Sequence, residues 1–158
     1  MTAIKYFAGI GSRETPPDIM DIMKKISTYL LPTHWLRSGG AEGADTAFYS
    51  GRDGIDCEIF RANDATPEAI ELASMYHPAW DRCTPFVKKL HGRNSMIILG
   101  RKLDSFVSSV ICWTPDGGPT GGTGLGIRIA QAYRIPIYNL YHTDARNTIL
   151  DVLKAKRV

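Results

Sequence analysis

The sequence lacks any long hydrophobic run. No apolar stretch approaches the roughly 20 residues that an α-helix needs to cross a bilayer, and the first residues do not follow the order of a signal peptide. We therefore expect no membrane partner and a cytoplasmic location. Internal repeats, low-complexity tracts and interdomain linkers are also absent, so residues 1–158 are predicted to form one domain.

Residues that form disulfides or bind metals are few. The three cysteines are odd in number and far apart, which fits neither a disulfide framework nor a CxxC metal site. The four histidines show no HxH or HxxxH spacing. We expect no metal and no cofactor, and we interpret Cys57, Cys83 and Cys112 as buried thiols.

Short apolar runs alternate with helical patterns along the chain. Strands are predicted at 3–10, 34–39, 57–62, 105–114 and 135–141, and helices at 19–30, 67–77, 84–100, 125–133 and 144–158, with one more helix entered from the loop 41–54. Gly92 is expected to break the helix 84–100. This alternation predicts an α/β fold, a doubly wound and mainly parallel sheet with helices on both faces.

Glycine is concentrated where three predicted strands lead into helices. The loops read "GIGSRETPP" (9–17, the first loop), "SGGAEGAD" (38–45, the second loop) and "PDGGPTGGTGLG" (115–126, the third loop). Ligands of such sheets bind beyond the carboxyl ends of the strands. Glycine lets a ligand approach the backbone, and free amides at a helix N-terminus attract anions. The three loops therefore predict a phosphate site. The alternative is that their glycines only form tight turns and bind no ligand.

The usual phosphate-binding motifs are incomplete. No lysine lies in any of the three loops, so the P-loop pattern GxxxxGK[ST] is absent. Glu14 occupies the third glycine position of the dinucleotide fingerprint GxGxxG. Neither an ordinary ATPase nor a dehydrogenase is expected. The segment 82–102 carries six basic residues and no acidic one, and it either faces phosphate or forms a solvated helix surface.

Four ordered motifs resemble the Rossmann-like domain of the DprA/Smf family. They are "GSR" (11–13), "SGGAEGAD" (38–45), "RNSMIILG" (93–100) and "GTGLGIRIA" (122–130). The chain is similar to a stand-alone member of that group, within the SLOG superfamily that also contains the LOG cytokinin-activating enzymes. The resemblance covers most of the chain and implies a Rossmann-like sheet, a phosphate-lined pocket at its carboxyl edge and a homo-oligomer.

The LOG enzymes share a PGGxGTxxE motif that this chain matches in part. The glycines correspond to Gly121, Gly122 and Gly124, but Thr120, Leu125 and Arg128 replace the proline, threonine and glutamate. Cleavage of an N-glycosidic bond develops positive charge that a carboxylate stabilises and a guanidinium does not. We expect no such catalysis from Arg128.

Carboxylates in the loops are the remaining catalytic candidates. Glu42 and Asp45 are weak ones, together with Glu14. The alternatives are a solvated loop residue for Glu42 and a helix N-terminal residue bonded to local amides for Asp45.

The predicted ligand-binding residues come from the three loops and from the segment that begins at Arg93. They are Gly11, Ser12, Arg13, Ser38, Gly39, Gly40, Ala41, Asp45, Arg93, Asn94, Gly118, Thr120, Gly121, Gly122, Thr123, Gly124 and Arg128. Arg13 and Arg93 are the expected phosphate donors, or else hold a carboxylate across the fold. Asn94 either contacts a sugar or base edge or caps a helix.

Three functions are compatible with this site. The first is a sensor or sequestering protein for a nucleotide or a nucleotide-derived molecule. The second, which the DprA resemblance implies, is single-stranded DNA binding, with Trp80, Trp113, Tyr76 and Tyr133 as stacking candidates. The third is a nucleoside-phosphate N-glycosidase. The net charge of +3 supplies few contacts for DNA phosphates.

Overall fold

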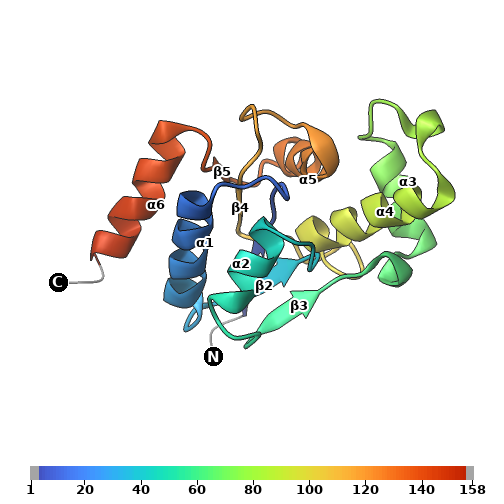
Figure 1. Ribbon diagram of the computed structural model, residues 1–158. Helices are drawn as coiled ribbons and strands as arrows, with labels where there is room; N and C mark the ends of the chain where they lie inside the picture. The colour runs from blue at the N-terminus through green and yellow to red at the C-terminus, as the bar shows by residue number, and fades with distance from the viewer. Residues whose placement is uncertain (1–3, 156–158) are drawn as a thin grey trace.

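A computed structural model describes residues 4–155. Its five strands form one parallel sheet in the order β3-β2-β1-β4-β5 (Figure 1). The strands are β1 (Lys5–Gly9), β2 (His34–Ser38), β3 (Cys57–Ile59), β4 (Ser109–Cys112) and β5 (Ile137–Asn139). The order reverses at β1, because β2 and β3 follow on one side of it and β4 and β5 on the other. The carboxyl ends of β1 and β4 therefore flank a crevice where α/β sheets bind ligands.

Helices cover both faces of the sheet, as the alternation of elements predicts. The helices are α1 (Pro17–Leu30), α2 (Ala44–Ser50), α3 (Pro67–Ser74), α4 (Pro85–Leu99), α5 (Gly121–Ala132) and α6 (Thr143–Ala155), with short 3-10 turns η1 (Ala62–Asp64) and η2 (Trp80–Arg82). One buried cluster packs α1, α2 and α6 against Phe7 and Ile111, and a second packs α3, α4 and α5 against Ala8 and Val110. Neighbouring residues of a strand point to opposite faces, so the two clusters share each central strand.

Helices α3 and α4, which pack on the same face of the sheet, each begin at a threonine N-cap. Thr66 Oγ1 accepts a hydrogen bond from Ala69 N–H at 3.1 Å, and Thr84 Oγ1 accepts one from Val87 N–H at 3.2 Å. Proline occupies the first turn of α3 and of α4. Each helix thus begins with an N-cap hydroxyl and a residue that needs no N–H partner.

The structure corrects several predicted boundaries. The strands are shorter than the apolar runs; β4, for example, covers four residues of the predicted 105–114. Helix α5 begins at Gly121 rather than near residue 125, so part of the third loop is helical. The predicted ends at residue 3 and at 156–158 lie outside the described residues.

Gly92 does not break its helix, because α4 runs continuously from Pro85 to Leu99. A Cβ at Gly92 would lie 2.6 Å from Ile70 Cγ1, so glycine here permits close packing of α3 against α4.

The prediction of three buried thiols is correct only for Cys112, since Cys57 and Cys83 are half-buried. None of the helices among residues 4–155 combines the length and the apolar character that a membrane span requires.

Candidate functional site

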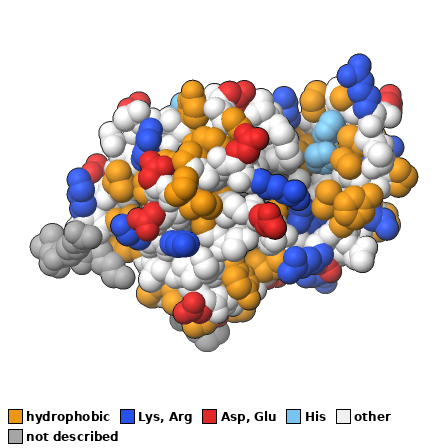
Figure 2. Space-filling view, viewed as in Figure 1, with side chains coloured by type: hydrophobic (Ala, Val, Ile, Leu, Met, Phe, Trp, Pro, Cys, Tyr) orange, Lys and Arg blue, Asp and Glu red, His pale blue; other side chains and the backbone are white. Residues whose placement is uncertain are grey.

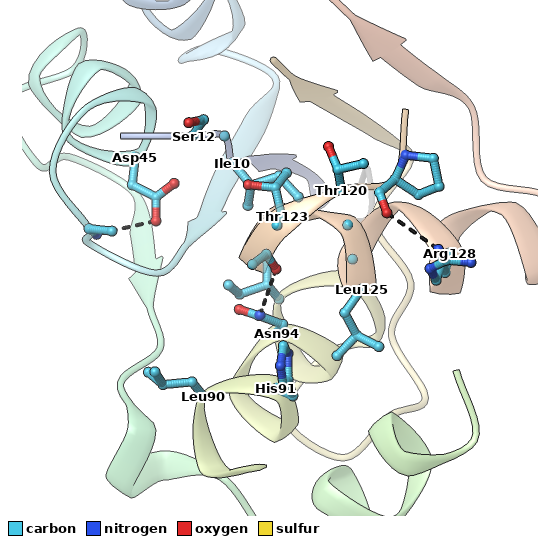
Figure 3. Close-up of a pocket in the computed structure, with 18 of the residues that line it drawn as sticks. Ile10, Ser12, Asp45, Leu90, His91, Asn94, Thr120, Thr123, Leu125 and Arg128 are labelled. Atoms are coloured by element: carbon cyan, nitrogen blue, oxygen red, sulfur yellow. Dashed lines mark hydrogen bonds between the residues drawn. The ribbon is translucent and has the colours of Figure 1, made fainter. Parts of the chain in front are cut away.

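A pocket of about 1010 Å³ opens at the crevice between β1 and β4. All three glycine-rich loops and helix α4 contribute to its wall. Figure 3 shows the first turn of α5 above Asn94, with His91 and Leu90 farther along α4 and Asp45 on the opposite side. The fold therefore brings together segments that are separated by up to about a hundred residues in sequence.

The third loop supplies backbone rather than side chains. Within residues 4–155, the N–H groups of Gly121, Gly122 and Thr123 have no protein acceptor. A Cβ at Gly122 would meet no protein atom within 4 Å. These amides begin a helix of twelve residues, where the helix dipole adds partial positive charge. The first turn of α5 thus presents free donors and an open approach to an anion.

Asn94 connects α4 to this turn. Its Nδ2 atom donates a hydrogen bond to the carbonyl oxygen of Gly122 at 3.2 Å (Figure 3). The side chain of Thr120 is held from the other side, because its hydroxyl donates to Asp116 Oδ1 at 2.8 Å. These two bonds are among several that hold the third loop in place, since the Thr114 hydroxyl also donates to the Gly118 carbonyl oxygen at 2.9 Å.

The first loop lies beside the same turn. Gly11, Ser12 and Arg13 all line the pocket. Ser12 Oγ accepts a hydrogen bond from Glu14 N–H at 3.0 Å, which gives the loop a local turn. A Cβ at Gly11 would lie 2.5 Å from Ala44 Cβ, so glycine lets β1 approach α2 closely. Arg13 is exposed, so its guanidinium is a solvent-accessible donor in the pocket wall.

The second loop contributes a buried carboxyl group. Asp45 lines the pocket, is 6% exposed, and accepts a hydrogen bond from Ala41 N–H at 3.2 Å. Burial raises the pKa of Asp45 to about 6, although the Ala41 amide and Arg93 oppose that rise. Asp45 therefore bonds a local amide, as one of its two alternatives expected, and it also lines the cavity, while a catalytic role stays a prediction.

Four predicted residues lie outside the wall of this pocket. Ser38 is buried, and its hydroxyl donates to the Gly9 carbonyl oxygen at 2.6 Å. A Cβ at Gly39 would meet Arg93 and Asp45, while Gly40 has a φ of +71° and lines a separate small pocket beside Arg61. Gly118 donates its N–H to Asp116 Oδ1. Glu42 is also outside the wall, whereas Glu14 is part of it.

The arginines of the pocket differ in how free they are. Arg93 Nη1 donates to the carbonyl oxygens of Gly39 at 2.9 Å and Phe60 at 3.0 Å, and burial lowers its pKa. Part of this guanidinium is therefore used to hold the fold. Arg128 Nη2 has one contact at 3.5 Å, to the Pro119 carbonyl oxygen. Arg128 and Arg13 are the more available cations.

Sequence reasoning missed the outer part of the pocket wall. The residues there include His77, Pro78, Val87, Leu90 and His91, from the end of α3 and from α4. They belong to no short motif. The helical spacing of Val87, Leu90, His91 and Asn94 was the available signal, because it places these residues on neighbouring positions of one helix face.

Comparisons of the chain with protein-family models, with curated proteins and with solved structures found no match.

Proposed function

We propose that the protein binds a nucleotide or a nucleotide-derived small molecule in this pocket, as a sensor or sequestering protein. The observation that carries the proposal is the first turn of α5. There, three amides that have no acceptor in the described part of the chain, and the open space at Gly122, face a cavity of about 1010 Å³. Such a turn is a ready anion site. The cavity is at the upper end of the range for small-molecule sites.

The two parts of the wall suit the two parts of a nucleotide. Arg13 and Arg128 add positive charge near the free amides, which favours a phosphate group. Val87, Leu90 and Leu125 form an apolar part of the wall, which favours a base. A ligand with a charged end and a flat apolar end satisfies both.

A thermal-shift panel of nucleoside mono-, di- and cyclic phosphates tests the proposal. A ligand at about 100 times its dissociation constant adds ~2.7 kcal/mol of stability, which raises the melting temperature by several degrees. We expect the shift to decrease in Arg13→Ala and Arg128→Ala. Arg82→Ala is the matched control, because Arg82 is exposed and lies outside the pocket wall. An unmoved melting temperature across the panel would count against the proposal.

Single-stranded DNA binding is the alternative outcome of the same experiments. The stacking candidates are engaged within the fold, since Tyr76 packs on Tyr133 at 6.5 Å and Trp80 on His77 at 6.0 Å between ring centroids. On the face of the molecule that Figure 2 shows, basic side chains are interspersed with acidic and apolar ones and do not form one continuous basic patch. Tight binding of oligo-dT that weakens steeply with salt, without any nucleotide shift, would favour DNA.

A nucleoside-phosphate N-glycosidase is a second candidate, and Asp45 is the observation that favours it. A buried carboxyl group with a pKa of about 6 can hold or release a proton near neutral pH. Incubation with nucleoside monophosphates, followed by chromatography for free base, tests this reaction. Release that disappears in Asp45→Asn but continues in Glu42→Gln would establish it.

Self-association and a cytoplasmic location remain predictions of the resemblance and the composition. Light scattering coupled to size-exclusion chromatography, with and without nucleotide, measures the mass of the particle and tests the first.

A further inference from the structure

Two histidines of the pocket wall and a neighbouring cysteine form a cluster of side chains that commonly bind transition metals. His77 follows α3, Cys83 lies between η2 and α4, and His91 lies on α4. One ligand atom from each falls within 4.8 Å of the other two. His77 Nε2 and Cys83 Sγ are 3.7 Å apart. In Figure 2, histidine side chains (pale blue) reach the surface over the region of α3 and α4.

These separations are close to those of a zinc site. In a tetrahedral site with the usual Zn–N and Zn–S bond lengths, a nitrogen and a sulfur ligand are about 3.6 Å apart, and two nitrogens about 3.4 Å. The His77–Cys83 distance already matches. The remaining separations are within 4.8 Å, so the ligand atoms must approach one another by up to about 1.4 Å to reach these values.

His91 carries an independent sign of a missing partner. The residue is 7% exposed, and its Nδ1 atom is buried without a hydrogen-bond partner among residues 4–155. Buried polar atoms are normally paired, so this imidazole needs a group that these residues do not supply.

We propose that His77, Cys83 and His91 form a binding site for a zinc-like transition-metal ion. Two imidazoles and a thiolate suit Zn²⁺ rather than Mg²⁺ or Ca²⁺, which prefer oxygen ligands. His77 and His91 line the pocket and Cys83 does not, so the fourth coordination position faces the cavity. Water or an anionic group of a pocket ligand occupies that position.

Binding requires one rearrangement of protons. His77 Nδ1 accepts a hydrogen bond from Ala79 N–H at 2.9 Å, which places the proton of the neutral ring on Nε2. When Nε2 binds the metal, the ring proton moves to Nδ1 and the Ala79 bond is lost. The Cys83 thiol releases its proton to solvent and binds as thiolate. The cost is the Ala79 N–H bond together with the two weak Cys83 Sγ contacts, to His77 Nε2 and to the Ala79 carbonyl oxygen, both at 3.7 Å, against three metal–ligand bonds.

Metal stoichiometry and cobalt spectroscopy test this site without any nucleotide, so their outcome is separate from that of the proposed function. Protein stripped with a chelator and dialysed against zinc should retain about one ion per chain, measured by plasma mass spectrometry. The cobalt-substituted protein should show a sulfur-to-cobalt charge-transfer band. Cys83→Ser should abolish that band, and His91→Asn should weaken zinc binding at least about tenfold.

Cys57→Ser is the matched control, because Cys57 is a half-buried thiol outside the cluster. It should keep both the stoichiometry and the band. Circular dichroism of the metal-free variants shows whether each is folded, and the wild-type cobalt spectrum stands even if a variant is not. Absence of retained zinc in the wild-type protein, or an unchanged cobalt band in folded Cys83→Ser, would overturn the assignment.

Discussion

Asn94 on α4 holds the carbonyl oxygen of Gly122 on the first turn of α5, with 3.2 Å between Nδ2 and the oxygen. The contact joins the wall of the pocket to the turn whose amides are free. One N–H of the Asn94 amide is thus used on the protein itself, where it positions the turn. Asn94 lies inside α4 and does not cap it, and it lines the pocket, so a contact with a sugar or base edge stays a prediction.

Removing that contact should loosen the turn. We expect Asn94→Ala to lower the free energy of unfolding by about 1 kcal/mol, the usual net value of one hydrogen bond, and to weaken nucleotide binding more than this loss alone explains. Denaturant unfolding and calorimetric titration measure the two effects. An Asn94→Ala protein with wild-type affinity would show that the turn needs no such support.

Substitution of two glycines in the third loop should have different effects, on ligand binding at Gly122 and on stability at Gly124. Gly122→Val should abolish or strongly weaken ligand binding while leaving the melting temperature near that of the wild type, because a Cβ there meets no protein atom. Gly124→Ala should destabilise the fold by about 1–3 kcal/mol, because its Cβ would lie 2.4 Å from the Pro119 carbonyl oxygen. Thermal melts with and without nucleotide separate the two cases. Equal loss of stability in both variants would contradict this distinction.

Asp45 should make stability fall as pH rises. Its folded pKa is about 6, above the usual value near 3.9 of an unfolded chain, so the folded state binds this proton more tightly. Ionisation of Asp45 therefore lowers the free energy of unfolding. This loss is absent at low pH, where Asp45 is protonated in both the folded and the unfolded state. It grows between about pH 4 and 6 and reaches at most roughly 3 kcal/mol above that window.

The Asp45→Asn variant isolates this effect. Relative to the wild type, its free energy of unfolding should rise between pH 4 and pH 7, as measured by denaturant unfolding at both values. Since all other groups titrate in both proteins, the difference reports Asp45. A difference that does not change with pH would show that Asp45 has an ordinary pKa.

Arg37 should be a strong determinant of stability away from the pocket. It is 3% exposed, its Nε donates to Glu58 Oε1 at 2.8 Å, and its guanidinium lies 3.8 Å above the Tyr6 ring centroid. It also donates to the Ser105 hydroxyl and carbonyl oxygens. Arg37→Met should cost about 2–3 kcal/mol, below the range for fully buried pairs because Glu58 is partly exposed.

Arg37→Lys is the informative comparison for that site. It keeps the charge but loses the fork of donors, so it should recover only part of the stability in denaturant unfolding. Full recovery would mean that charge alone matters there.

Much of the fold was predictable because its signals are local. Alternating apolar runs and helical spacing indicated the parallel sheet and both helix layers, and the three glycine-rich loops were correctly expected at one edge of it. The strand ends were less predictable. An apolar run such as 105–114 continues past the last ladder hydrogen bond, and pairing with β1 and β5 decides that β4 covers Ser109–Cys112.

By itself, the sequence determined the order of the elements and the glycine positions that leave backbone accessible, because periodicity and missing side chains are properties of neighbouring residues. Tertiary structure alone decided which loop residues face the cavity. Ser38 and Gly118 belong to the same loops as residues of the wall, yet the Ser38 hydroxyl bonds inward to Gly9 and the Gly118 N–H bonds to the exposed side chain of Asp116. Tertiary structure also brings His77, Cys83 and His91 close together. Packing sets the path of the chain between α3 and α4, and the spacing of the three residues along the sequence does not encode that path.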